Sequence, residues 1–185
     1  MPTIVRLFWR DGFDRLTLDQ VASELGVTKP TVVRALGDKE GIFAKALDAY
    51  YQTHIRPGER LLETAPDFRS AIAGCFRTSI DRILNPDNPQ GCFLTDVTLT
   101  GAFTEGPVAR TIASIQDRTL ELLQGRIQEA KASGELRVDA EPAAVLNYVL
   151  AQFAALSAVS RFPQTRSALE AVVDYMVAGL PWSQP

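Results

Sequence analysis

Apolar residues recur three and four positions apart along most of the chain, and this spacing restricts the fold more than any other feature. Side chains at that spacing share one face of an α-helix, whereas a half-buried strand alternates with a period of two. No alternation of period two extends over a useful length of the sequence. The sequence therefore predicts an all-α protein.

Nine helices are expected, and glycines, prolines and capping residues mark their ends. Their approximate ranges are 2–11, 17–25, 28–36, 38–57, 66–84, 92–103, 105–133, 141–162 and 164–179. The fourth is expected to be interrupted near Pro57-Gly58, and "NPDNPQG" at 85–91 is expected to be a loop. The first three helices predict a small module over 1–45, which the fourth joins to a larger helical bundle over 46–185.

Composition restricts the class of protein. Hydrophobic residues make up 46% and charged residues 22% of 185, which is typical of a globular chain. No uninterrupted apolar run reaches the roughly 18 residues of a membrane span, and the N-terminus does not resemble a secretory signal. Cys75 and Cys92 give neither a disulfide framework nor zinc spacing. A cytoplasmic protein without a metal or cofactor is expected.

Residues 17–36 contain two short helices separated by "LGVT", a turn with one glycine. This is the geometry of a helix-turn-helix, whose second helix lies in the major groove of DNA. The exposed side of the second helix offers Thr28, Lys29, Thr31 and Arg34, which can reach phosphates and base edges. A solvated surface turn or a protein-docking helix would also explain a short polar helix at this place.

The charge distribution permits nucleic-acid contact only at the N-terminal end. Residues 1–45 carry seven Lys and Arg against six Asp and Glu, while the rest of the chain carries twelve against sixteen. The overall net charge of −3 argues against a broadly basic surface.

At residues 7–43, "LFWRDGFDRLTLDQVASELGVTKPTVVRALGDKEGIF", the chain resembles the TetR family of transcriptional regulators. The features that match are the Gly-Phe after helix one, the Thr17 cap, "VASELGVT", Thr31 and "DKEGIF". The remaining 140 residues resemble the family only in length and helical architecture. The resemblance implies a sequence-specific repressor that a small apolar or amphipathic effector releases from its operator.

The residues expected to contact double-stranded DNA are Thr17, Thr28, Lys29, Thr31, Arg34 and Lys39. Lys39 is included because the corresponding lysine of the family lies near the phosphate backbone; a merely solvated lysine is the alternative. Two features depart from the family pattern: Val33 replaces a tyrosine that typically contacts phosphate, and the basic extension before helix one is missing. A helical ligand-binding or adaptor dimer with a decayed DNA-reading helix is therefore the alternative function.

The last two helices are the most apolar part of the chain and predict a homodimer interface. The interface residues expected are Val149, Phe153, Leu156, Val173 and Met176. The alternative is that these residues are simply core. An effector cavity is expected among the preceding helices, lined by Phe68, Phe76, Phe93, Val97, Phe103, Ile112 and Gln116. Ordinary packing is again the alternative for these aromatic residues.

The two cysteines and the single histidine raise two further types of site. Cys75 and Cys92 could form a thiol sensor, although such cysteines usually behave as small buried apolar residues. An enzyme is not expected, because the sole histidine, His54, has no nucleophile near it in sequence. No phosphate-binding glycine loop, metal-ligand cluster or nucleophile elbow is present in the sequence.

Overall fold

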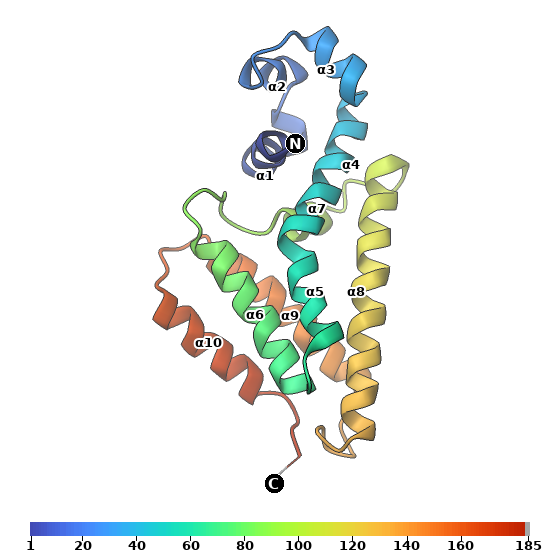
Figure 1. Cartoon of the computed structure of the whole chain (residues 1–185), viewed down its shortest axis with the longest axis vertical. Helices are drawn as coiled ribbons and strands as arrows, with labels where there is room; N and C mark the ends of the chain where they lie inside the picture. Colours follow the sequence, from blue (N-terminus) through green and yellow to red (C-terminus); the bar gives the residue numbers. More distant parts are fainter. Residues whose placement is uncertain (184–185) are drawn as a thin grey trace.

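A computed structural model describes residues 1–183 as helices joined by short loops (Figure 1). The helices are α1 (Pro2–Arg15), α2 (Leu18–Glu24), α3 (Lys29–Leu36), α4 (Lys39–Tyr50), the π-helical turn η1 (Tyr51–Ile55), α5 (Arg56–Thr64), α6 (Phe68–Leu84), α7 (Phe93–Thr100), α8 (Gly106–Ala132), α9 (Pro142–Val159) and α10 (Arg166–Ala178). Within this described part, β pairing is confined to one isolated bridge between Leu136 and Trp182. The predicted all-α fold is confirmed.

The head of the molecule consists of α1, α2 and α3, and local sequence signals define its helices (Figure 1). Gly12 has φ +76, and this left-handed backbone breaks α1 close to where the sequence predicted its end. Thr17 and Gln20 form a reciprocal capping box at the start of α2. Gly26 has φ +67 and turns the chain from α2 toward α3.

A long rod leads from the head into the bundle. Helix α4, the π-turn η1 and α5 follow one another without a loop, so together they correspond to the single interrupted helix that the sequence predicted. The interruption lies at Tyr51–Ile55, just before the predicted Pro57. Because proline has no N–H to donate to the carbonyl four residues earlier, the regular α-helical pattern fails in the preceding turn.

Two hydrophobic clusters stabilise the chain. The first joins α1, α2, α3 and α4 but also takes Phe93 and Val97 from α7 and Val108 from α8. The second lies in the bundle formed by α5, α6, α8, α9 and α10. The core of the head therefore extends beyond residues 1–45, and both α7 and the start of α8 attach the bundle to it.

Helix α9 is unusually apolar for its position. It is the one helix in residues 1–183 that is long and apolar enough, by length and composition alone, to cross a membrane, although the sequence had predicted no such span. Its mean hydropathy is 1.5, yet only 22% of its residues are buried inside the single chain. An apolar helix with a largely uncovered surface needs another partner for that surface.

Candidate functional site

Helices α2 and α3 form a compact pair at the tip of the head. Val21, Ala22 and Val32 are buried between them and the neighbouring helices, whereas Lys29 and Arg34 are exposed on α3. Val33 is 40% exposed on the same helix. The pair therefore presents a short, polar and lightly basic helix to solvent.

Polar contacts organise the start of α3. Thr28 occupies the N-cap position as predicted, but its hydroxyl makes no capping bond and lies 3.0 Å from the Thr31 hydroxyl instead. The Lys29 ammonium forms a 2.9 Å ion pair with Asp19 on α2. Both partners are exposed, so the pair contributes at most about 1 kcal/mol and can exchange for another anion.

The junction between α3 and α4 holds two further cations. Lys39 is the first residue of α4, and its ammonium lies 4.5 Å from the centre of the Phe13 ring. Lys45 donates a 2.7 Å hydrogen bond to the carbonyl of Leu36 at the end of α3. Asp38 caps α4 by accepting from the Gly41 amide at 2.8 Å. Lys39 is thus placed beside α3 by packing rather than left free in solvent.

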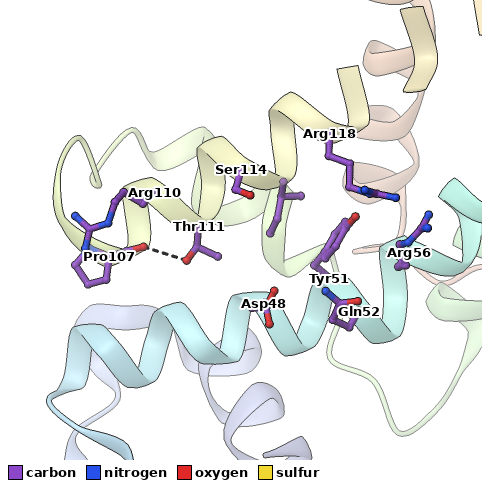
Figure 2. Close-up of a pocket in the computed structure, with 10 residues that line it drawn as sticks. Asp48, Tyr51, Gln52, Arg56, Pro107, Arg110, Thr111, Ser114 and Arg118 are labelled. Atoms are coloured by element: carbon purple, nitrogen blue, oxygen red, sulfur yellow. Dashed lines mark hydrogen bonds between the residues drawn. The ribbon is translucent and has the colours of Figure 1, made fainter. Parts of the chain in front are cut away.

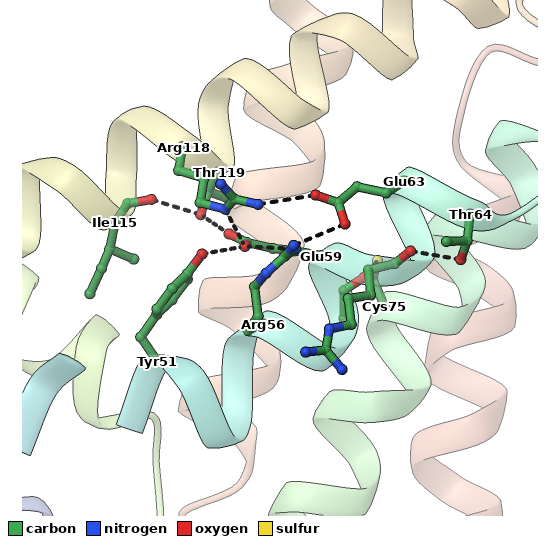
Figure 3. Close-up of polar contacts among 11 residues, drawn as sticks. Tyr51, Arg56, Glu59, Glu63, Thr64, Cys75, Ile115, Arg118 and Thr119 are labelled. Carbon is green, nitrogen blue, oxygen red and sulfur yellow. Dashed lines mark hydrogen bonds and ion pairs between the residues drawn. The ribbon is translucent and has the colours of Figure 1, made fainter. Parts of the chain in front are cut away.

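A buried carboxylate lies where the rod crosses α8. Figure 3 shows Glu59, which is 3% exposed, at the centre of a polar network. It accepts hydrogen bonds from the hydroxyls of Tyr51 at 2.5 Å and Thr119 at 2.7 Å, and from Arg118 at 3.4 Å. Arg56 adds an ion pair at 3.7 Å. The network ties η1 and α5 to α8, although nothing in the sequence indicated it.

An open groove of about 730 Å³ runs along the outer face of the same junction (Figure 2). Asp48, Gln52, Arg110, Ser114 and Arg118 line it, and all five side chains are exposed. Such an open, polar surface excludes little water and does not have the enclosed shape of a small-molecule site.

A partly enclosed cavity of about 150 Å³ lies in the bundle and includes Glu59 in its wall. Helices η1, α5, α6, α8 and α9 and the start of α7 contribute to this wall. The polar lining residues include His54, Ser79, Arg82 and Thr95, and the apolar ones include Leu123, Leu150 and Phe153. The lining residues include none of the seven residues that the sequence predicted around an effector.

The predicted effector residues are distributed over two regions. Phe68 and Phe76 belong to the bundle cluster, where Phe76 packs against Phe153 with ring centres 4.7 Å apart. Phe93, Val97, Phe103 and Ile112 pack with the head cluster, and Gln116 is exposed. Phe93, Val97 and Phe103 do line a separate hollow of about 540 Å³ against α1. The seven residues therefore do not surround one cavity.

Sequence comparison assigns both parts of the chain. Residues 3–46 match the family described as "Bacterial regulatory proteins, tetR family", and residues 69–176 match "Tetracyclin repressor-like, C-terminal domain". The chain belongs to the TetR family of transcriptional regulators.

Individual TetR-family proteins support the same assignment. The HTH-type transcriptional repressor ComR of Escherichia coli K12 is 29% identical over 143 residues, which are 71% of this chain and 63% of ComR. The chain thus spans less than two thirds of that curated relative. A cysteine mutant of the TetR family transcriptional regulator CifR, complexed with 26bp double-strand operator DNA, aligns with a TM-score of 0.82 at 25% identity, covering 96% of this chain and 93% of CifR. The reduced form of NemR from E. coli aligns with a TM-score of 0.75 at 14% identity, covering 100% and 96%, which shows a shared fold.

The structure shows where the predicted interface residues of this TetR-family chain lie. Val149, Leu156 and Val173 are fully buried inside the single chain, and Met176 is 6% exposed. Phe153 is half-buried and packs on Phe76. Val149, Leu156 and Val173 therefore pack as core within one chain, which leaves them no surface for a second copy. The exposed residues of α9 are mostly small: Ala143, Ala144, Asn147, Ala151, Ala155 and Ala158.

Neither cysteine has the surroundings of a reactive thiol. The Cys75 thiol donates to the carbonyl of Gly58 at 3.1 Å, and burial raises the pKa of Cys75 to about 12. Cys92 is 4% exposed, and its sulfur accepts from the Tyr50 hydroxyl at 3.2 Å. A thiol sensor needs an accessible thiolate, which burial disfavours. Among residues 1–183, no group of three or more His, Cys, Asp or Glu side chains could hold a metal ion.

Proposed function

We propose that this chain is a homodimeric repressor that binds a specific operator through α2 and α3 and is released by a small molecule. The observation that carries the proposal is the short α3 with its exposed Lys29 and Arg34. It lies at the far end of the rod that leads back into the bundle (Figure 1), where the cavity is found. Membership of the TetR family supports it.

Different residues of the head would have different roles on DNA. Arg34 and Thr31 lie on α3 and would read base edges in the major groove. Thr17 and Thr28, at the starts of α2 and α3, would contact phosphates through hydroxyls and nearby backbone amides. Lys39 at the start of α4 would contact the backbone, as would Lys29 after exchanging Asp19 for a phosphate. These few contacts favour a two-headed dimer over a monomer.

The surface of α9 supports the dimer. Four of its five exposed alanines, Ala144, Ala151, Ala155 and Ala158, recur at helical spacing and would let a second copy of the helix approach closely. Phe162 and Tyr175 are 67% and 78% exposed. Burial of such a patch between two copies would remove apolar surface from water at about 25 cal/mol per Å². The monomer would then be a soluble, cytoplasmic subunit whose apolar α9 is covered by its partner.

The effector would occupy the partly enclosed cavity rather than the predicted ring of phenylalanines. His54 and Ile55 of η1 line the cavity, so a ligand there would touch the turn that connects α4 to the bundle. Control requires a ligand that binds the DNA-incompetent arrangement more tightly than the competent one. Coupling of about 1–3 kcal/mol would weaken operator binding roughly five- to 150-fold.

Selection of bound fragments from a random DNA library, at a stated salt concentration, tests the central claim. A recurrent palindromic sequence is expected. On that sequence, Arg34→Ala should relax base preference at defined positions and cost about 1–3 kcal/mol of binding free energy. Lys39→Ala should weaken binding to all sequences alike and reduce the slope of log K against log salt by about one. An equal, sequence-independent loss for both variants would contradict base reading by α3.

An adaptor or ligand-binding dimer without DNA function remains the second candidate, and exposed Val33 favours it. Restoring a phosphate-reaching side chain with Val33→Tyr distinguishes the two. A functional reading helix predicts measurable operator binding before the substitution and stronger binding after it. Absence of any selected sequence from both proteins would favour the adaptor.

A further inference from the structure

Arg82 is a buried cation that forms no ion pair among residues 1–183. The residue is 7% exposed, belongs to α6 and lines the partly enclosed cavity. One terminal nitrogen donates to the carbonyl of Gly91 at 2.8 Å, while its Nε is buried without any hydrogen-bond partner among residues 1–183. Because burial of an unpaired guanidinium costs several kcal/mol, an anion bound beside Arg82 would stabilise it.

The groups around Arg82 suit an anion. His54, Ser79 and Thr95 line the same cavity and can donate hydrogen bonds. His54 is neutral near pH 7, because burial and then the charge of Arg82 lower its pKa to about 4. The positive charge among these groups therefore comes from Arg82 alone. A planar guanidinium with a free N–H matches the geometry of a carboxylate.

The carboxylate that lines the cavity, Glu59, already has hydrogen-bond and ion-pair partners. Glu59 accepts from Tyr51, Thr119 and Arg118, and Arg56 lies at 3.7 Å. It consequently offers little attraction to a ligand cation, yet it would repel a second negative charge. The cavity thus distinguishes a monoanion from a dianion and from a cation.

We propose that the effector is a small monocarboxylate whose carboxylate is bound by Arg82 and whose short apolar body packs toward Leu123, Leu150 and Phe153. This inference rests on the proposed function for its regulatory meaning, and it names the chemical class of the ligand. The small cavity volume of about 150 Å³ favours a ligand with a short apolar body. Acetate, propanoate and butanoate fit this description.

The position of the anion also explains how binding would be transmitted. A carboxylate on Arg82 would accept from His54 in η1, and the His54 ring makes an edge-to-face contact with Trp9 in α1, with ring centres 5.3 Å apart. The ligand would thus contact the π-turn and, through His54, the first helix of the head. The fluorescence of Trp9 can therefore be used to follow ligand binding once Trp182, the other tryptophan, is replaced by Phe.

The decisive experiment uses the full chain and pairs of matched ligands. Propanoate and its neutral isostere propanamide are titrated at constant ionic strength, with binding followed by calorimetry and by Trp9 fluorescence in Trp182→Phe. Propanoate is expected to bind and to raise the melting temperature, while propanamide, chloride and octanoate are expected to bind at least tenfold more weakly. Equal binding of propanoate and propanamide, or of propanoate and chloride, would overturn the proposal without any need for a variant.

A pair of arginine variants on α6 then locates the site. Arg82→Gln should weaken propanoate binding by about ten- to 100-fold, the loss expected for a charge-assisted hydrogen bond. Its melting temperature without ligand should be unchanged or higher, because an uncompensated buried charge is removed. Arg77→Gln removes a 55% exposed arginine from the same helix and should bind propanoate normally. An Arg82→Gln protein with normal propanoate affinity would contradict the assignment.

Operator binding separates this inference from the proposed function. Without ligand, the native protein and Arg82→Gln should bind the selected operator equally. Propanoate should release the native protein from the operator but not the variant. If the protein binds propanoate but selects no DNA, the repressor function fails and the monocarboxylate site stands. If it binds operator and no monocarboxylate, the site assignment fails and the repressor function stands.

Discussion

The hydroxyl of Tyr51 lies 2.5 Å from a carboxylate oxygen of Glu59, and both side chains are buried. Tyr51 begins the π-turn η1 and Glu59 lies in α5, so the bond spans the irregular part of the rod. Burial, and then Glu59 itself, raise the pKa of Tyr51 to about 12, which keeps the hydroxyl protonated and donating. This bond fixes the geometry at which α4 leaves the bundle.

Tyr51→Phe should lower the free energy of unfolding by about 1.5–3 kcal/mol, the range for a hydrogen bond to a charged group. Urea denaturation measures the loss. Thr53→Ala is the matched control, because Thr53 lies in the same turn and is exposed. That control should change stability by no more than about 0.5 kcal/mol. If Tyr51→Phe behaved like Thr53→Ala, the bond would not stabilise the turn.

Asp19→Asn should strengthen DNA binding. The Asp19 carboxylate forms an ion pair with the Lys29 ammonium at 2.9 Å. It also adds a negative charge beside the surface that is proposed to face phosphates. Its removal frees Lys29 and reduces repulsion, and the gain should be about 1 kcal/mol or less, up to about fivefold in affinity. The slope of log K against log salt should become steeper by up to about one. Asp174→Asn, on α10 and also in an exposed ion pair, should leave DNA affinity unchanged.

Stability should fall as the pH is lowered from about 6.5 toward 4, and His54 should account for part of the fall. In the folded chain the pKa of His54 is about 4, against an ordinary 6.5, because burial and Arg82 disfavour its charged form. Between these values the unfolded chain binds more protons than the folded one, so acid favours unfolding. His54→Gln should flatten this part of the curve of unfolding free energy against pH. An unchanged curve would show that His54 remains accessible to protons.

Local signals allowed most of the head to be predicted from sequence. The capping box at Thr17 and the left-handed Gly26 act within a few residues, so their effect can be recognised without knowing the rest of the fold. The placement of Phe93 could not be predicted in this way. Its apolar character indicates burial, but only the tertiary structure decides that it packs against Phe43 in the head cluster rather than beside Phe76.

The sequence did not predict the cavity, because two of the residues that line it are charged, nor the surface of the proposed interface, because the hydropathy of α9 is uniform. Arg82 and Glu59 are types that are rarely buried, so no pattern marked them as interior. Helix α9 is apolar on all sides, and periodicity therefore did not distinguish its inward Val149 from its outward Ala151. The small size of the α9 residues such as Ala151 and Ala155 was a weak signal for this surface, because small side chains permit the close approach of a second helix.

Ala151→Glu combined with Ala155→Glu should convert the proposed dimer into a folded monomer. Both alanines are exposed on the same side of α9, so two carboxylates would face their copies across a two-fold axis and lose hydration there. Light scattering should give about twice the chain mass of 20.3 kDa for the native protein and about that mass for the variant.

Ala132→Glu, at an exposed alanine of α8, is the control and should remain dimeric. Val149→Asp should instead lose helical circular dichroism, since it places a charge in the monomer core. A dimer that survives the double substitution would place the interface elsewhere, whereas a folded monomer with weakened operator binding would tie DNA recognition to the pairing of two heads.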